Sequence, residues 1–485
     1  MISLKTLHKH HRWVGLAVCF FLAMLCVSGV LLNHRDWIRD CEVSRQWLPP
    51  MYDFENWNGG LMRGTVPLGG DSVIIYGVNG MWLTDTSTKA VCDFNAGLPA
   101  GADHRAIRRV VRASDGRLYA AAQYGLYRYD GQWRHIDIGL GEDDRLTDIE
   151  AAGDTLVVIS RSHAYASVSP FAHFRRIEIK APDGYQPKAT LFRTVWLLHS
   201  GELYGQWGKF VVDLIAVILI ALTLTGLAFF ILRKHINRRV KNGVVADRPR
   251  HWLKGTLWFH NKAGRWTIVL TLFIAVTGWC LRPPVMVPLA MTKTRPLPGS
   301  ILDNDNPWHD KLRLIRHDDA HGDWLLSTSE GFLGLDSLNA TPRLLKHTPP
   351  VSVMGLNVWE RDERGQWLCG SFSGLFRWHR DKGQATDYFT GQAAPETSGP
   401  PFGKRAVSGF SADLTPTPLV AEYYEGTDRY PQPPELRELP MSLWNVALEI
   451  HSGRIFIGSV ATYIFIFIIG LAVIWTLYTG YRLKK

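Results

Sequence analysis

The chain has 485 residues, of which 46% are hydrophobic and 20% charged, with a formal net charge of +10. Its apolar residues are concentrated in four runs of membrane-spanning or near-spanning length, which excludes a soluble cytoplasmic enzyme, a disordered chain and a disulfide-rich secreted domain. The six cysteines form no C-x-x-C or C-x-x-C-H motif, which excludes a thioredoxin-type site and covalent c-type haem attachment.

The four apolar runs extend over residues 13–33, 214–232, 266–281 and 455–481. A bilayer core of about 30 Å needs about 20 helical residues, and the third run reaches that length only with the Pro-rich residues after it. The first run is longer than the apolar region of a cleaved signal peptide and no A-x-A-like site follows it, so we expect a retained anchor.

Lysines and arginines gather in the N-terminal segment, in residues 233–265 and in the C-terminal tail. This bias predicts four crossings of a bacterial inner membrane, with both termini in the cytoplasm and two long periplasmic segments. Because the basic residues lie next to the span ends, we interpret them as a topology signal and expect lipid, not nucleic acid, as their partner.

The predicted organisation alternates membrane spans with water-exposed segments. In order, it has a cytoplasmic N-terminus and first span (1–34), a periplasmic β segment (35–198), a second span with an outer histidine motif (199–232), a basic cytoplasmic loop (233–262), a third span (263–285), a second periplasmic β segment (286–450), and a fourth span with the cytoplasmic tail (451–485).

The two periplasmic segments contain a recurring pattern of strand, Gly turn and strand. Clear copies occupy 116–130, 322–336 and 365–379, and weaker copies occupy 71–85 and 153–166. Within one segment the copies start roughly 40 residues apart, which is typical of β-propeller blades. We therefore expect one all-β, propeller-like domain built from both segments, and two separate small β domains are the alternative. Residues 384–440, rich in Pro, Gly and Thr, are predicted to be a loop or covering arm.

A second repeat lies in the membrane part. The motif His11-x3-Gly15-x12-Ser28-Gly29 is matched by His260-x3-Gly264-x12-Thr277-Gly278, and His199-Ser200-Gly201 before the second span is matched by His451-Ser452-Gly453 before the fourth. The second and fourth spans also both end near Thr-Gly, at 225–226 and 479–480. Spans one and two therefore look like a duplicate of spans three and four, which predicts a four-helix membrane bundle with a 2+2 repeat.

The duplication arranges four histidines in two pairs. His11 and His260 lie at the cytoplasmic ends of spans one and three, and His199 and His451 lie at the outer ends of spans two and four. If the halves pack about an axis normal to the membrane, the members of each pair face each other. Two opposed neutral imidazoles can bind a haem iron from both sides and leave no open position, so such a haem carries electrons. Small residues beside the histidines would let the macrocycle approach the backbone: Gly15, Gly264, Gly201 and Gly453.

Nearby ionisable residues leave alternatives open. His34 is a rival ligand at the outer site, and His10 could replace His11. Interfacial histidines can also be simple polar caps. Asp213, at the start of the second span, could relay a proton, hold an outer histidine or face water. Cys41 and Cys92 could form a disulfide in an oxidising periplasm.

Several of these motifs together resemble the PepSY-associated transmembrane family of bacterial inner-membrane proteins. The matching stretches are His11-Arg-Trp-Val-Gly-Leu with Ser28-Gly-Val-Leu-Leu, Leu198-His-Ser-Gly-Glu-Leu-Tyr-Gly with Leu224-Thr-Gly-Leu, and Ile450-His-Ser-Gly-Arg-Ile-Phe. Members of that family include di-haem ferric reductases that take iron from siderophores and a relative that aids ferrous iron uptake. The resemblance implies two non-covalent b-type haems at the paired histidines and reduction of periplasmic Fe(III). The outer segments differ from the family pattern, because they contain propeller-like hairpins and no recognisable PepSY domain.

We therefore expect an inner-membrane oxidoreductase that passes electrons to ferric iron or a ferric chelate in the periplasm. The donor would be a cytoplasmic flavin or flavoprotein that docks on the basic loop, or quinol within the membrane. The alternative is a non-enzymatic module in which the spans anchor a propeller-like domain that binds a partner.

Overall fold

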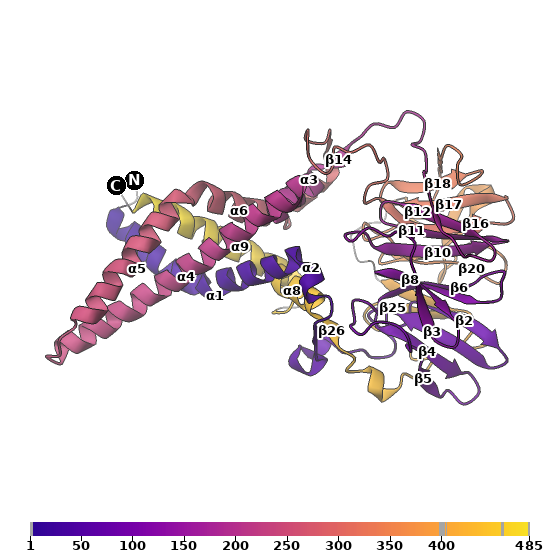
Figure 1. Ribbon diagram of the computed structural model, residues 1–485, viewed down its shortest axis with the longest axis horizontal. Helices are drawn as coiled ribbons and strands as arrows, with labels where there is room; N and C mark the ends of the chain where they lie inside the picture. The colour runs from indigo at the N-terminus through magenta and orange to yellow at the C-terminus, as the bar shows by residue number, and fades with distance from the viewer. Residues whose placement is uncertain (1–2, 397–402, 404, 457–459, 484–485) are drawn as a thin grey trace. The chain divides into compact units, whose positions relative to one another are not determined.

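The computed structural model contains two compact units, one helical and one all-β (Figure 1). It describes residues 3–396, 403, 405–456 and 460–483. Residues 397–402 and 404 of the predicted arm, and residues 457–459 of the predicted fourth span, lie outside the described residues. The helical unit comprises Met1–Ile38, Gln186–Asn304 and Leu443–Lys485, and the β unit comprises Arg39–Tyr185 and Asp305–Ser442.

Within the described residues of the helical unit, three helices are long and apolar enough to cross a membrane. They are α1 (Leu4–Asn33), α4 (Gly205–Lys241) and α9 (Val460–Arg482). Helix α1 packs against both α4 and α9, and Cys26, Ile215 and Leu219 are buried in a small apolar cluster between α1 and α4. Three of the predicted spans are therefore present as candidate membrane helices.

The predicted third span is a bent pair of helices. Helix α5 (Asp247–Trp266) is basic, whereas α6 (Ile268–Cys280) is apolar, and the two meet at a bend of 68°. The 13 residues of α6 are fewer than the about 20 that a bilayer requires, and Pro283 and Pro284 oppose its continuation. The pair makes a fourth crossing only if both helices count as one span.

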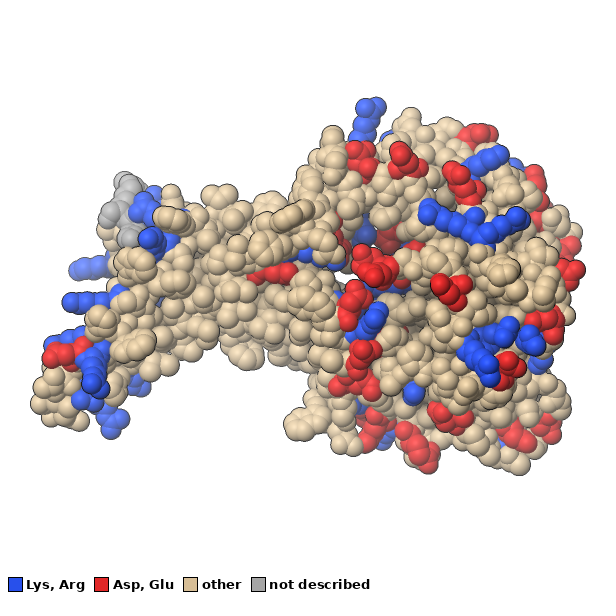
Figure 2. Space-filling model, in the orientation of Figure 1, with Lys and Arg blue, Asp and Glu red and all other residues tan. Residues whose placement is uncertain are grey.

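Charge is distributed unevenly over the face of the helical unit that Figure 2 shows. Lysines and arginines gather around the hairpin between α4 and α5 and near the start of α1, while the rest of this face of the unit shows almost no charged residues (Figure 2). The first turns of α1 and the last turns of α9 lie together at one end of this unit (Figure 1).

Two short helices precede the long ones and shift the predicted boundaries. Helix α3 (Leu191–Ser200) and helix α8 (Leu443–Ser452) belong to the helical unit, although the sequence suggested β segments up to residues 198 and 450. The Thr190 side chain caps the start of α3, and Gly201 ends it with a φ of 82°, a left-handed conformation that favours glycine. The short helices α2 (Arg35–Ile38) and α7 (Met286–Met291) complete the unit, with the strand pair β14 (Ala189–Thr190) and β15 (Lys293–Thr294).

Among the described residues, the β unit contains five antiparallel sheets of four strands and one of two strands, besides a minor pair of two-residue strands. The first chain segment forms three sheets, which are β2 (Gly64–Gly69), β3 (Ser72–Gly77), β4 (Gly80–Asp85) with β5 (Val91–Asp93); β6 (Ile107–Arg112), β7 (Leu118–Ala122), β8 (Gly125–Tyr129) with β9 (Trp133–Ile136); and β10 (Leu146–Ala152), β11 (Thr155–Ser160), β12 (Ala164–Val168) with β13 (Arg175–Ile177). The second segment forms two more four-stranded sheets, which are β16 (Leu312–Asp318), β17 (Asp323–Thr328), β18 (Gly331–Leu335) with β19 (Arg343–Leu344); and β20 (Leu356–Arg361), β21 (Trp367–Ser371), β22 (Gly374–His379) with β23 (Gln384–Asp387). It also forms the two-stranded sheet of β24 (Val407–Ser411) and β25 (Leu419–Glu422). A minor strand pair joins β1 (Glu42–Val43) to β26 (Met441–Ser442).

The five predicted hairpins form the second and third strands of the five larger sheets. Glycine is needed where the third strand begins, because Gly331 and Gly374 have φ angles of 131° and 136°, which residues with a Cβ rarely adopt. The hairpin prediction is therefore confirmed.

The first strands of the six sheets contact one another in the order β2, β6, β10, β16, β20 and β24, and β24 contacts β2 again. One buried apolar cluster lies between each neighbouring pair of sheets. Each of the two chain segments supplies three sheets to this single unit.

The prediction of a loop or covering arm over residues 384–440 was wrong at three short strands. The segment contains β23, β24 and β25, and Val407 and Leu419 are fully buried. These strands have only four or five residues and are separated by Gly and Pro, so they show too little apolar–polar alternation for a strand to be recognised.

Candidate functional site

The four duplicated histidines lie in the two predicted pairs. The rings of His11 on α1 and His260 on α5 have centroids 6.2 Å apart. The rings of His199 on α3 and His451 on α8 have centroids 6.1 Å apart. All four side chains are partly buried. Each pair combines one histidine from each predicted half of the chain.

The Nδ1 atom of every one of these rings meets an uncharged oxygen of a neighbouring helix. His260 Nδ1 lies 3.0 Å from Thr225 Oγ1, and His199 Nδ1 lies 3.2 Å from Thr277 Oγ1. His451 Nδ1 lies 3.0 Å from both Ser28 Oγ and the Leu25 carbonyl. His11 Nδ1 lies 3.1 Å from the Thr476 carbonyl and 3.4 Å from Thr479 Oγ1. In the described part of the chain, no hydrogen bond engages any of the four Nε2 atoms.

These contacts determine which ring nitrogen carries the proton. A carbonyl oxygen only accepts, so Nδ1 of His11 and of His451 must donate. The hydroxyl of Thr225 donates its single proton to the Ala221 carbonyl at 2.7 Å, and Thr277 donates to Phe273 at 2.9 Å. Each hydroxyl therefore accepts from Nδ1–H of its histidine, and the lone pair of the neutral ring lies on Nε2, the atom available to a metal.

The glycine after each hydroxyl residue makes room for the imidazole. A Cβ built on Gly278 would lie 2.7 Å from His199 Cε1, and one on Gly480 would lie 2.8 Å from His11 Cε1. The same contact measures 3.3 Å for Gly29 with His451 and 3.4 Å for Gly226 with His260. The Ser/Thr-Gly dipeptides are thus sockets for the histidines, in which the hydroxyl orients the ring and the glycine admits it.

The spacing of the rings matches that of a metal held between two imidazoles. Two metal–nitrogen bonds of about 2.0 Å, plus about 1.1 Å from each nitrogen to its ring centre, separate the centroids by about 6.2 Å. The measured 6.2 and 6.1 Å agree with that sum. Among the described residues, no cluster of three or more His, Cys, Asp or Glu side chains could hold a metal ion. The donor set is therefore two imidazoles per site, which suits a macrocycle that supplies its own four nitrogens.

The two pairs lie far apart along α1. Helix α1 contains His11 of one pair and Ser28, which contacts His451 of the other. These positions differ by 28 − 11 = 17 residues, which is about 25 Å of helix. The pairs are thus separated by most of the thickness of a bilayer core.

The alternative ligands are engaged elsewhere. His34 Nε2 lies 2.6 Å from an Asp213 carboxylate oxygen, and its ring stacks on Trp37 at 3.8 Å. His10 lies against Trp475. Asp213 therefore contacts His34 and not His199 or His451, and the Asn33 amide links it to the Ser200 carbonyl beside His199.

The other glycines and the cysteines named from the sequence have the following surroundings. Gly15 and Gly264 face side chains of α9 and α4, while Gly201 and Gly453 end helices with positive φ angles. That these glycines let a macrocycle approach the backbone stays a prediction. Cys41 and Cys92 are both exposed free thiols, so they do not form a disulfide.

Two further features surround the outer pair, and the sequence did not reveal either of them. The Arg282 guanidinium lies 3.5 Å from the His451 carbonyl, and no carboxylate of the described residues lies within ion-pair distance of it. An apolar cavity of about 290 Å³ lies between α1 and α8 and borders Ser28. Its other lining residues are Phe20, Ala23, Met24, Val27, Leu31, Leu443, Ala447 and Ile450.

The sequence showed the Ser/Thr-Gly dipeptides only as markers of duplication. Their role as histidine sockets depends on contacts between helices, such as α1 with α9, that lie more than 400 residues apart in the chain. One signal was available: the number of dipeptides equals the number of duplicated histidines.

Together, these features define a membrane-anchored protein whose helical unit contains two pairs of facing histidines and whose second unit is a large antiparallel all-β domain. The chain belongs to the family described as PepSY-associated TM region, whose model matches residues 8–483.

No curated protein matches the chain. Among solved structures, a structural genomics protein of unknown function from Bacteroides thetaiotaomicron matches 77% of this chain and 70% of its own, at 10% identity and a TM-score of 0.38. The extracellular domains of a putative one-component system and a putative hybrid two-component system from that organism each match 65% of this chain, at 11% and 12% identity and TM-scores of 0.24. This chain covers 33% and 32% of those two proteins.

Proposed function

We propose that this protein is a di-haem b-type oxidoreductase of the bacterial inner membrane that passes electrons to a periplasmic acceptor, namely ferric iron or a ferric chelate. The observation that carries the proposal is the arrangement of His11 with His260 and of His199 with His451. In both pairs the ring spacing and the free Nε2 lone pairs suit axial ligation of a haem.

A haem held between two neutral imidazoles supplies one-electron transfer and no site for oxygen. The chain's own residues would determine how each haem is held. The hydroxyls of Ser28, Thr225, Thr277 and Thr479 orient the imidazoles and hold the ring proton on Nδ1. Arg282 places a positive charge beside the outer pair, where it would attract the carboxylates of a macrocycle.

The distribution of charge supports the proposed topology. The basic residues gather around the α4–α5 hairpin and near the start of α1, and the first turns of α1 lie beside the last turns of α9 (Figures 1 and 2). Lys/Arg-rich ends favour the cytoplasmic side. In this proposal α5 and α6 form one broken span, the four spans make a 2+2 repeat, and the β unit lies in the periplasm.

The electron donor would be a separate molecule. Helix α5 exposes Trp252 and Trp258 beside its basic residues, and it also carries His260 of the inner pair. An anionic flavin or an acidic flavoprotein would be attracted to that hairpin. Quinol in the membrane is the other donor class.

Reduction is a plausible way to release iron on the outer side. Hard oxygen ligands hold Fe(III) far more tightly than Fe(II), so one electron frees iron from such a chelate. We further propose that the six sheets form a propeller-like domain, because their first strands contact one another in a closed order and an apolar cluster fills each interval between neighbours.

The test is the optical spectrum and haem count of the purified full chain. We expect two low-spin b haems per polypeptide, with bands that sharpen on reduction by dithionite. His260→Ala and His451→Ala should each lose about one haem, whereas the matched control His251→Ala changes an exposed histidine and should retain both. Unchanged haem content in the first two variants would reject the ligand assignment.

A second candidate function is a non-enzymatic membrane-anchored binding protein. The polar cavity of the β unit favours it, since that cavity has no part in electron transfer. Colourless protein, purified after expression with ample haem, would favour this candidate.

A further inference from the structure

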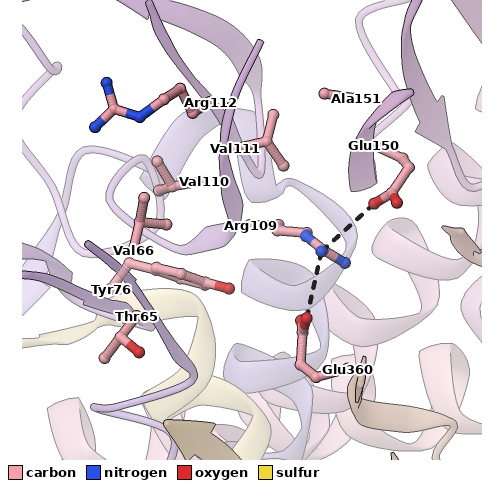
Figure 3. A pocket seen from close by; sticks show the side chains of 10 residues that line it. All are labelled: Thr65, Val66, Tyr76, Arg109, Val110, Val111, Arg112, Glu150, Ala151 and Glu360. Atoms are coloured by element: carbon pink, nitrogen blue, oxygen red, sulfur yellow. Dashed lines mark hydrogen bonds and ion pairs between the residues drawn. The ribbon is translucent and has the colours of Figure 1, made fainter. Parts of the chain in front are cut away.

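The β unit contains a cavity of about 260 Å³, which has room for several water molecules or one small organic molecule. It is lined by residues of the first strands of four sheets, β2, β6, β10 and β20, and by Tyr76 of β3 (Figure 3). The lining residues with polar side chains are Thr65, Tyr76, Arg109, Arg112, Glu150 and Glu360, and of these Arg112 already donates to the Gly116 and Pro67 carbonyls. A site at the meeting point of several sheets is held rigidly by all of them.

One ion-pair network lies beside this cavity, in which Arg316 also lies 3.8 Å from Glu150 and 3.7 Å from Glu360, and its contacts differ in tightness. Arg316 donates to Asp148 at 2.5 Å and to the Trp359 carbonyl at 2.7 Å, and its side chain is only 3% exposed. Arg109 instead lies 3.4 Å from Glu150 and 3.4 Å from Glu360, one on each side (Figure 3). The first pair is structural, whereas the second is too long for strong hydrogen bonds.

The loosely held groups retain unused hydrogen-bonding capacity. Arg109 Nη1 and Glu150 Oε2 are buried and have no hydrogen-bond partner. The Tyr76 hydroxyl points toward Arg109 in Figure 3, and no hydrogen bond engages it within the described chain. Buried polar groups are normally satisfied, so their convergence on one cavity indicates a missing partner.

The chemistry of these groups selects the class of ligand. Arg109 and Tyr76 donate hydrogen bonds and suit a carboxylate, while Glu150 and Glu360 accept and suit an ammonium group. A metal ion, which needs several ligand oxygens around it, is disfavoured, because Arg109 lies between the two carboxylates and keeps them from meeting on one ion. A plain anion would meet two negative charges within the same cavity.

We propose that this cavity is a binding site for a small zwitterion of the amino-acid type, with its carboxylate on Arg109 and Tyr76 and its ammonium group on the Glu150 carboxylate, whose Oε2 atom has no hydrogen-bond partner. The site lies wholly within the β unit and does not depend on the proposed electron transfer.

The titration of Glu150 provides a readout specific to this ligand class. Burial raises the pKa of Glu150 to about 7, against the opposing effect of Arg109. The charged groups that face it are Arg109 on β6, Arg316 on β16 and Glu360 on β20, with Asp148 on its own strand and Asp319 beyond β16. A ligand ammonium group favours the ionised carboxylate, so binding near pH 7 releases a proton, whereas an anion would cause proton uptake.

The experiment is calorimetric titration of the full chain in detergent, using glycine, L-serine and L-glutamate as zwitterions and acetate and methylammonium as single-charge probes. At least one amino acid should bind saturably and about tenfold or more tightly than either single-charge probe. Repeating the titration in two buffers of different ionisation enthalpy should show proton release.

The variants Arg109→Gln and Glu150→Gln should each weaken the binding about tenfold, and Arg134→Gln, which changes an exposed arginine of β9, should leave it unchanged. If Arg109→Gln fails to fold, Tyr76→Phe removes one donor only and should still weaken binding. Absence of saturable binding by all three amino acids, or equal binding by Arg109→Gln or Tyr76→Phe, would overturn the proposal.

Discussion

The four socket glycines allow a sharp test, because the structure predicts opposite results for closely similar substitutions. A Cβ on Gly278 or Gly480 would lie 2.7 or 2.8 Å from the Cε1 atom of its histidine, whereas a Cβ on Gly226 would lie 3.4 Å away. Carbon atoms pack favourably at about 3.5–4.0 Å. The His199 and His11 rings would therefore have to move by about 0.8 Å, and the His260 ring hardly at all.

A displacement of that size is a large fraction of a metal–nitrogen bond of about 2.0 Å. We expect Gly278→Ala to lose the outer haem and Gly480→Ala to lose the inner haem, each retaining about one haem per chain. Gly226→Ala should retain both haems. A pyridine haemochrome assay per polypeptide, with the low-spin spectrum, measures this result.

Alanine favours a helix over glycine by roughly 0.5–1 kcal/mol, so haem loss in these variants could not be attributed to a weaker helix. Thermal unfolding of each variant provides the control. Retention of two low-spin haems by Gly278→Ala, with loss in Gly226→Ala, would refute the socket interpretation.

Three further predictions concern other parts of the chain. Thr225→Val removes the acceptor of His260 Nδ1 and should weaken inner haem retention about 10–100-fold on titration with an apo-haem acceptor, while Thr225→Ser should not. Arg282→Gln removes a positive charge beside the outer pair, and the loss of this charge favours the ferric state of the outer haem. Redox titration should therefore show an outer midpoint potential lower by several tens of millivolts. An unchanged potential would exclude a role for this charge. Asp318 is 1% exposed, and hydrogen bonds from Arg380 and Arg361 outweigh burial and lower its pKa. Asp318→Asn should therefore cost about 3–5 kcal/mol in thermal unfolding near pH 7. In the wild type this contribution is present above the unfolded pKa of about 3.9 and is lost as the pH falls below it; equal stability at pH 7 would contradict the reasoning.

Local patterns made much of the β unit predictable. A hairpin depends on alternation and on a glycine such as Gly331 that tolerates a positive φ, and both are visible within 15 residues. The segment with β24 and β25 was missed because its strands are stabilised by contacts with other sheets: the Phe410 amide donates to the Arg63 carbonyl, far away in the chain. Such pairing leaves no local signal.

The histidine pairs were predictable for a different reason. Duplication reveals equivalent positions without any knowledge of packing, and His11 with His260 and His199 with His451 followed from matched spacing alone. The hydrogen-bond partners of the histidines could not be predicted from the sequence. A contact such as that of His34 with Asp213 depends on how far two helices are shifted along, and rotated about, their axes. Asp213 therefore holds a histidine, but not one of the paired ones.

The choice of hydroxyl partners has a physical consequence that connects the fold to the proposed chemistry. A carboxylate beside Nδ1 would place a negative charge within the apolar part of a membrane, at a cost of several kcal/mol. A serine or threonine hydroxyl, whose own proton is donated to a carbonyl of its helix, accepts a hydrogen bond from Nδ1–H without adding a charge, and the lone pair of the neutral ring then lies on Nε2. In each pair, one histidine comes from the first half of the chain and the other from the second half, so neither half alone completes a pair. The same division holds in the β unit, where each segment contributes three of the six sheets.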